Sequence, residues 1–402
     1  MVDIGAASPA LAADRRDGRA HAMPEAAAVD VAAADEAALR DYEEFCRNAV
    51  HGPCQHPVWV RAWIAATGAD AVIVTLARGG RPVVKLALEV VAKGPLRIAR
   101  FIGGNHANGN FAALARSAAT HAAGPDRAAL TAALRKARPD IDLVFLSRQN
   151  PRFEGVDNPL AGLAAMQSPN ISLAIDLAGG FAAVLERHNA ARKRKKLKYQ
   201  LNRFKQAGGY TLIEATTPAE VERILETFFA LKGASLRSKG IADAFADEEI
   251  RAFFRGLFRD ALRESDPPFL LHAVEVGGEI AAINGLSVTR ETVVCEFGTY
   301  SNADPRTSPG YFMDYTNIEW ACGRGKAIYD FSVGDEEYKR SWCDIETWQF
   351  ETLLPLGARG GALALYERAR AAAVHALKSS PVLWALAKRL RARVGGKNPA
   401  DA

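Results

Sequence analysis

The stretch TVVCEFGTYSNADPRTSPGYFMDYTNIEWACGRGKAIYDFSVGDEEYKRSW, residues 292–342, decides how we interpret this chain. Residues 292–299 are rich in β-branched and aromatic side chains, which predicts a strand. Residues 302–310 are dense in turn formers, so the chain must change direction there. Residues 311–322 are long and apolar enough for a buried helix that ends at two nearby glycines. Residues 327–331 then predict a second short strand, before an acidic turn with a tyrosine and a lysine.

A helix that begins at Gly310 would present free backbone N–H groups and the positive end of its dipole to the preceding loop. An anion can bind at such a position. The order strand, loop, helix, strand is also how ordinary α/β proteins are built. This pattern alone therefore leaves both interpretations open.

The acidic turn carries a more specific motif. Residues 329–342, YDFSVGDEEYKRSW, resemble the DFxxGxxxYKxxW signature of the CelD-type (BioF2-like) branch of the GNAT acetyltransferase-like proteins, whose nearest relatives are the FemAB-type transferases. The resemblance extends through residues 277–282, 236–240, 192–204 and 56–63, and covers most of the chain from Tyr42 to Leu354. It implies an α/β fold with mixed sheets, a tandem of two GNAT-like acyl-CoA N-acyltransferase domains whose central strands part to admit an acyl donor.

Length and composition agree with two globular units. The chain has 402 residues, of which 49% are hydrophobic, so it can fill more than one core. Its five cysteines form neither a paired framework nor a CxxC motif, which indicates a reducing compartment and predicts a cytoplasmic protein. Residues 1–38 are alanine-rich and lack the apolar core of a signal peptide, so we expect a disordered leader. No apolar run is long enough for a transmembrane helix.

The remaining pattern predicts the following division. Residues 39–149 form an N-terminal GNAT-like half, with a helix over 42–66, a hairpin around 78–81 and a strand at 141–147. A linker occupies 150–170, and a C-terminal GNAT-like domain with the active site occupies 171–357, including a hairpin on Gly277 and Gly278. Residues 358–402 form a basic amphipathic helical tail.

Positive charge is concentrated in two segments without acidic residues. Residues 187–205 hold nine Lys or Arg and residues 368–397 hold eight, although the whole chain carries only +5. The first segment predicts an amphipathic helix that contacts the phosphates of a cofactor, an anionic glycan or tRNA, or is simply a solvated face. The second could lie on an anionic membrane surface or pack against the protein's own body.

The resemblance implies transfer of an acyl group from acetyl-CoA or another acyl-CoA, without a metal, to an amine or hydroxyl of a glycan or other small-molecule acceptor. Such a reaction needs a proton acceptor, N–H donors for the tetrahedral oxyanion and a proton for the leaving thiolate. Our catalytic candidates are Asp330 or Glu296 as the base, Tyr338 as the proton donor and Lys339 as a stabilising charge. Each also has a purely structural interpretation, as an outward strand residue, a turn or a surface charge.

For the donor we predict the loop and first helical turn, through Arg306, Ser308, Gly310 and Tyr311. The sequence departs here from the Q/R-x-x-G-x-G/A loop of acetyltransferases, since Pro309 and Tyr311 stand where glycines are expected. For the acceptor we predict Arg237, Lys239 and Trp342. The Gly/Asn-rich loop at residues 103–111 could line a cleft between the halves through His106, Asn108 and Asn110, or could be a set of turns.

The main hypothesis is an acyltransferase acting on a polysaccharide or cell-envelope intermediate. The alternatives are a FemAB-type transferase that uses aminoacyl-tRNA, and a noncatalytic accessory protein of exopolysaccharide or cellulose biosynthesis. The sequence has no paired His and Cys spacing for a metal, and no GxSxG or P-loop motif, which argues against metalloenzymes, α/β-hydrolases and P-loop enzymes.

Overall fold

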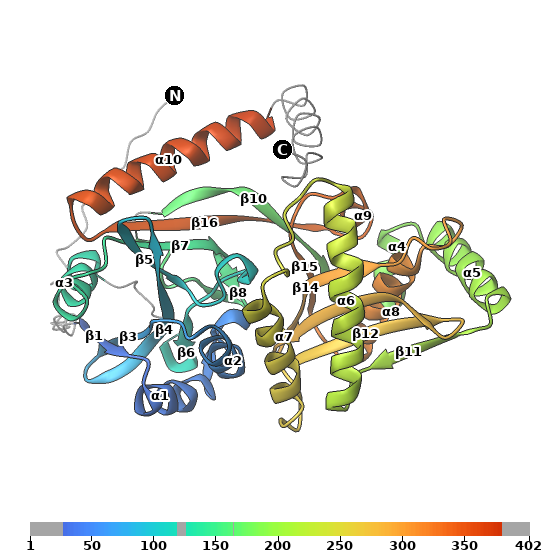
Figure 1. The fold of residues 1–402 in the computed structure, drawn as a ribbon, viewed down its shortest axis with the longest axis horizontal. Coiled ribbons are helices and arrows are strands. Elements are labelled where there is room, and N and C mark those ends of the chain that lie inside the picture. Colours follow the sequence, from blue (N-terminus) through green and yellow to red (C-terminus); the bar gives the residue numbers. More distant parts are fainter. Residues whose placement is uncertain (1–26, 119–125, 164, 380–402) are drawn as a thin grey trace, which may run out of the picture.

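The computed structural model describes residues 27–118, 126–163 and 165–379 (Figure 1). The first half consists of β1 (Ala27–Ala33), α1 (Glu36–Cys46), β2 (Ala49–Val50), α2 (Pro57–Thr67), β3 (Ala71–Arg78), β4 (Arg81–Lys93), β5 (Leu96–Phe101), β6 (Ala113–Ala115), α3 (Arg127–Ala137) and β7 (Leu143–Gln149). Two short strands, β8 (Arg152–Phe153) and β9 (Val156–Asp157), pair with each other and lead to the long strand β10 (Ala165–Asp176).

The second half consists of α4 (Gly180–Arg187), α5 (Ala190–Gln206), β11 (Tyr210–Glu214), α6 (Pro218–Ser238), α7 (Glu248–Ala261), β12 (Phe269–Val276), β13 (Glu279–Val288), β14 (Thr292–Tyr300), α8 (Pro309–Gly323), β15 (Ile328–Val333), α9 (Glu337–Arg340), β16 (Ile345–Pro355) and α10 (Ala358–Ser379). The hairpin between β12 and β13 turns on Gly277 and Gly278, as predicted. Both have positive φ, 59° and 89°, which suits a tight turn whose twist matches that of the strands.

One mixed sheet runs through both halves. Its described strands follow the order β1-β3-β4-β5-β7-β16-β10-β15-β14-β13-β12-β11, with β6 on β4 and β2 on β6. Two pairs are parallel, β5 with β7 and β14 with β15, and a helix joins each pair, α3 in the first half and α8 in the second. The predicted mixed α/β class is confirmed, and the parallel pair with its crossing helix occurs once in each half.

The two halves also share a hydrophobic core outside the sheet. Trp59 and Trp63 of α2 both pack edge-on against Phe253 of α7, with ring centroids 4.9 Å apart in each case. Trp59 is 1% exposed and Phe253 is fully buried. Side chains of this size stabilise a fold by about 2 kcal/mol each when fully buried, so this contact contributes strongly to holding the halves together.

The structure corrects several details of the sequence interpretation. Residues 27–38 were expected within a disordered leader, but they form β1 and the start of α1. Strand β1 pairs along its whole length with β3. The helix expected over 42–66 is two helices, because Gly52 and the prolines at 53 and 57 interrupt it. The expected linker at 150–170 contains β8, β9 and the start of β10. Residues 1–26 and 380–402 lie outside the described residues.

Helix α10 lies along the face of β16, β10 and β7, as Figure 1 shows at the top of the molecule. Leu363, Ala364 and Ala371 are buried there. Glu367 is buried too and pairs with Lys93 of β4 at 2.9 Å and with Arg370 at 2.7 Å. The first part of the predicted basic tail therefore packs against the protein's own body through one face.

Candidate active site

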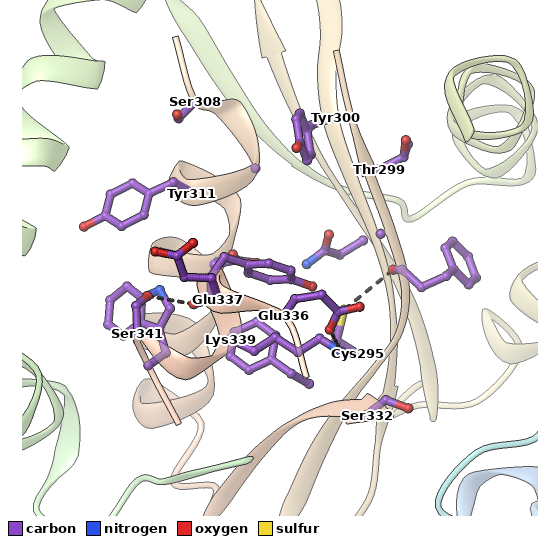
Figure 2. A pocket seen from close by; sticks show the side chains of 18 of the residues that line it. Cys295, Thr299, Tyr300, Ser308, Tyr311, Ser332, Glu336, Glu337, Lys339 and Ser341 are labelled. Carbon is purple, nitrogen blue, oxygen red and sulfur yellow. Dashed lines mark hydrogen bonds and ion pairs between the residues drawn. The ribbon is translucent and has the colours of Figure 1, made fainter. Parts of the chain in front are cut away.

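The site lies where β14 and β15 part. The two strands pair in parallel over only three positions, from Thr292 opposite Ile328 to Val294 opposite Asp330. Beyond that point β14 remains paired only with β13, and β15 remains paired only with β10. Helix α8 begins at Pro309 after the loop that leaves β14. Figure 2 shows the start of α8, with Ser308 just before it and Tyr311 in its first turn, beside β14, which carries Thr299 and Tyr300.

A cavity of about 1340 Å³ fills this opening. Its walls come from β14, the start of α8, α5, the end of α6 and the segment from Phe331 to Trp342. The first half contributes Asn108 and Arg148. A cavity of this size exceeds the usual range for small-molecule sites, which suits one large ligand or two ligands side by side.

Of the four carboxyl groups that line the cavity, Glu296 and Asp314 have strongly raised pKa values. Burial raises the pKa of Glu296 to about 8, with a smaller contribution from the nearby Asp330 charge. The Ser287 hydroxyl donates to Glu296 Oε1, while Oε2 is buried and has no hydrogen-bond partner among the described residues. Burial raises the pKa of Asp314 on α8 to about 7. Groups that titrate this close to neutral pH can exchange protons with a substrate.

The cavity is otherwise rich in positive charge. Six of its cationic side chains form no ion pair with a carboxylate among the described residues: Arg148, Arg192, Lys193, Lys196, Lys232 and Lys239. Lys193 is 6% exposed, and burial together with the neighbouring Lys196 and Arg192 lowers its pKa to about 8. Of the six only Lys193 is buried, and an unpaired buried charge is costly. A cavity that gathers it with five further unpaired cations is suited to an anionic ligand.

Aromatic rings hold two of these lysines. Lys193 Nζ lies 3.3 Å from the centroid of the Trp342 ring and donates to the Ser341 carbonyl at 2.8 Å. Lys196 Nζ lies 3.9 Å from the centroid of the Tyr311 ring. Cation–π contacts of this kind fix a lysine without neutralising it. Trp342 and Tyr311, predicted to bind acceptor and donor, therefore touch the basic helix α5.

The structure brings most of the predicted site residues to this cavity. Glu296, Tyr338, Lys339, Ser308, Gly310, Tyr311, Lys239 and Trp342 line it. Lys339 is buried, donates to the Val333 carbonyl at 2.9 Å and pairs with Glu336 at 3.0 Å. Tyr338 is 52% exposed. Their roles remain predictions, but their positions are compatible with one site.

Three predicted residues lie elsewhere. Asp330 accepts hydrogen bonds from the Ser172 hydroxyl of β10 at 2.9 Å and from the Ser332 backbone N–H at 2.6 Å, so its carboxylate holds the end of β15 against β10. Arg306 is exposed and pairs with Asp304 at 2.9 Å. Arg237 is an exposed residue in the last turn of α6. None of the three lines the cavity.

Sequence reasoning overlooked Asp314 and Arg148. Asp314 stands in the otherwise apolar run YFMDY, three residues after Tyr311, and that isolated charge on a buried helix was a usable signal. Arg148 had no such signal, because only the tertiary fold brings it to the second half. Among the described residues, no group of His, Cys, Asp and Glu is arranged to hold a metal ion.

A family-model match over part of the chain supports an acyltransferase enzyme with a GNAT domain. Residues 191–340 match the family model described as acetyltransferase (GNAT) domain, from α5 through α9. The match spans both walls of the opening between β14 and β15. No curated protein matches the sequence.

The solved structure of FemX shows the same fold, with 13% identity and a TM-score of 0.54, over 79% of this chain and 96% of that one. Two further solved structures are similar with lower TM-scores. The tandem GNAT protein from the clavulanic acid biosynthesis pathway has 14% identity and a TM-score of 0.44, with 83% and 99% covered. The C-terminal domain of a putative lysylphosphatidylglycerol synthetase from Agrobacterium fabrum has 12% identity and a TM-score of 0.48, with 83% and 97% covered.

Proposed function

We propose that this protein transfers an acyl group from acyl-CoA to an amine or hydroxyl of a polysaccharide or cell-envelope intermediate. The observation that carries the proposal is the parting of β14 and β15 above a large cavity lined by unpaired cations. The acceptor class, like the CelD-type branch, rests on the resemblance of residues 329–342 to that family. The five free cysteines favour the cytoplasm.

The donor side fits the phosphates of coenzyme A. Arg192, Lys193 and Lys196 line the cavity from α5, and Gly310 lies in the first turn of α8. A side chain at Gly310 would place its Cβ 2.9 Å from the Tyr300 ring, so glycine keeps the backbone of α8 close to β14. The helix N-terminus and the lysines can together bind phosphate although the glycine-rich loop of other acetyltransferases is missing.

The cavity supplies the groups that acyl transfer requires. We assign Glu296 as the base that takes the proton from the acceptor nitrogen or oxygen as the new bond to the acyl carbon forms. The carbon–sulfur bond of the thioester then breaks, and the leaving thiolate takes a proton from Tyr338. Lys339, buried and adjacent to Glu336, stabilises negative charge in the same cavity. Asp330 is not the base in this scheme, because its carboxylate is occupied by Ser172 and Ser332.

Calorimetry with acetyl-CoA and free CoA tests the donor. We expect binding to the wild-type protein and a loss of about tenfold in affinity in Lys196→Ala, because a charge-assisted contact to phosphate disappears. Lys195→Ala is the matched control, since Lys195 is the adjacent exposed lysine and does not line the cavity. Absence of binding to any acyl-CoA would contradict the proposal, and equal losses in both variants would contradict a specific role for Lys196.

Aminoacyl-tRNA remains the second candidate donor, because Arg194, Lys195 and Lys198 are exposed on the outer side of α5. That face would bind RNA with steep salt dependence. A gel-shift titration of total tRNA at several salt concentrations, with Lys195→Ala and Lys198→Ala, separates the two donors. RNA binding weakened in these variants, without CoA binding, would favour tRNA.

Contact with a membrane surface is a further part of the proposal. Leu365 and Tyr366 of α10 are 67% and 58% exposed, on the side of the helix away from its buried face. No helix among the described residues is long and apolar enough to cross a bilayer. Flotation with anionic vesicles, comparing wild type with Leu365→Ser, tests peripheral contact; binding unaffected by the substitution would contradict a role for α10.

A further inference from the structure

Arg148 enters the cavity from the first half in an unusual backbone conformation. It lies near the end of β7 with φ of 53°, in the left-handed region that long side chains rarely adopt. Opposite it, the register between β7 and β16 shifts, so that Ser147 and Arg148 together face Glu351 alone. This is a β-bulge, and bulges next to active sites redirect a side chain.

The Gly/Asn-rich loop at residues 103–111 holds this bulge in place. The Asn110 backbone N–H donates to the Arg148 carbonyl at 2.9 Å, and the Asn110 side chain donates to the Ser147 carbonyl at 2.9 Å. Asn110 is 1% exposed. The loop singled out in the sequence therefore fixes the backbone of Arg148.

The same loop fixes the guanidinium. Arg148 Nη1 donates to the Asn108 side-chain oxygen and to the Asn105 carbonyl, both at 2.8 Å. Nε and Nη2 donate to no described residue, and no carboxylate within the described part of the chain forms an ion pair with this arginine. Glu351 is close enough to act on it electrostatically without forming an ion pair, and burial raises the pKa of that carboxyl.

We infer that Arg148 is a specificity-determining residue that binds an oxyanion group, a carboxylate or a phosphate, on the acceptor. The free edge of its guanidinium presents two N–H donors in the geometry that such groups accept. Arg148 comes from β7 in one lobe, whereas the lysines assigned to the donor lie on α5 at the opposite edge of the other lobe (Figure 1). Assigning the anion to the acceptor rests on the proposed function; the existence of the anion site does not.

Titration of the full-length protein with sodium phosphate and with sodium acetate, at constant ionic strength in sodium chloride, tests the site. The titrations are run with and without saturating CoA, so that the α5 cations are occupied in one series. We expect the CoA-loaded wild type to bind at least one of the two anions, with about tenfold weaker binding in Arg148→Gln. The anion affinity of Arg148→Lys should lie between those of the wild type and Arg148→Gln, because lysine keeps the positive charge but lacks the planar edge with two N–H donors.

Arg152→Gln is the matched control. Arg152 lies four residues away, has a side chain 66% exposed and does not line the cavity, so its variant should bind the anion like wild type. Arg148→Gly, which suits the positive φ, should keep or raise the melting temperature while losing the anion. Asn108→Ala should weaken anion binding without changing CoA affinity.

No specific phosphate or acetate binding to the wild type, or equal binding in Arg148→Gln, would overturn the inference. The relative responses to phosphate and acetate identify the class of oxyanion. CoA affinity is measured on the same samples. If CoA fails to bind, the proposed function falls, while the comparison of wild type with Arg148→Gln in the CoA-free series still decides the anion site.

Discussion

Replacing Glu296 with glutamine gives the most direct test of the active-site chemistry. Burial raises the pKa of Glu296 from its ordinary 4.5 to about 8. A difference of this size would correspond to about 5 kcal/mol between the two protonation states. The side chain is only partly buried, beside an open cavity, so water reduces the effect, and we expect about 1–2 kcal/mol.

The sign follows from proton binding. Between pH 4.5 and about 8 the folded protein keeps a proton on Glu296 that the unfolded chain has released, so this group's contribution to stability falls as pH rises. Glutamine resembles the protonated carboxyl and cannot ionise. Glu296→Gln should therefore match the wild type in stability at pH 5 and exceed it at pH 9. Urea unfolding at several pH values measures the difference.

The catalytic rate of the wild type should rise with pH over the range in which its stability falls. If Glu296 is the base, release of CoA from acetyl-CoA in the presence of an acceptor should rise with pH through about 8 in the wild type. The rate of Glu296→Gln should not rise with pH, and it should be lower than that of the wild type by at least about a hundredfold. The control is Glu291→Gln, an exposed glutamate just before the same strand. A stability difference that stays constant from pH 5 to pH 9 would refute the reasoning.

Three further predictions follow from individual contacts. In Gly360→Ala the new Cβ would lie 1.7 Å from the Asp142 carbonyl oxygen, so the free energy of unfolding, measured with urea, should fall by about 1–3 kcal/mol. The control is Gly361→Ala, whose Cβ meets nothing within 4 Å and which should not show this loss. Asp314→Asn should tighten CoA binding several-fold above pH 7 and little at pH 5.5. Burial raises the pKa of Asp314 to about 7, so its carboxyl is mostly charged only above that value. Calorimetry measures the CoA affinity, and equal effects at both pH values would contradict this. Lys339→Met should lower the free energy of unfolding, measured with urea, by about 1–3 kcal/mol, because the partly buried Val333 carbonyl loses its donor; an unchanged value would show that water replaces the lysine.

The local elements around the site could be predicted because their signals are local. The turn at Gly277 and Gly278, strand β14, helix α8 and strand β15 each follow from residues within a dozen positions. Helix α7 also had a readable pattern, since Phe253, Phe254, Leu257 and Phe258 fall at helical spacing, and it was overlooked.

Other features depend on contacts far along the chain. Strand β16 pairs with β7 about two hundred residues earlier, and both its faces are covered, so it lacks the alternation of a half-exposed strand. Arg148 reaches the cavity only through the bulge opposite Glu351. Arg306 fits one position of the donor motif in sequence, but its side chain forms an ion pair with Asp304 and does not line the cavity. Spacing along the chain cannot supply such information.

The shared sheet has a consequence for how this protein can be divided. A fragment of residues 171–357, the unit that carries the family match and most of the cavity, would lose β7 and uncover one backbone edge of β16 from Phe350 to Pro355. Leu353 and Leu354 on that edge are at most 1% exposed in the whole protein. An open apolar strand of this kind pairs readily with other copies, so such a fragment would aggregate rather than report on catalysis. The N-terminal half thus covers an edge of the half that carries the family match, and we expect the two to stay soluble only when they are expressed together.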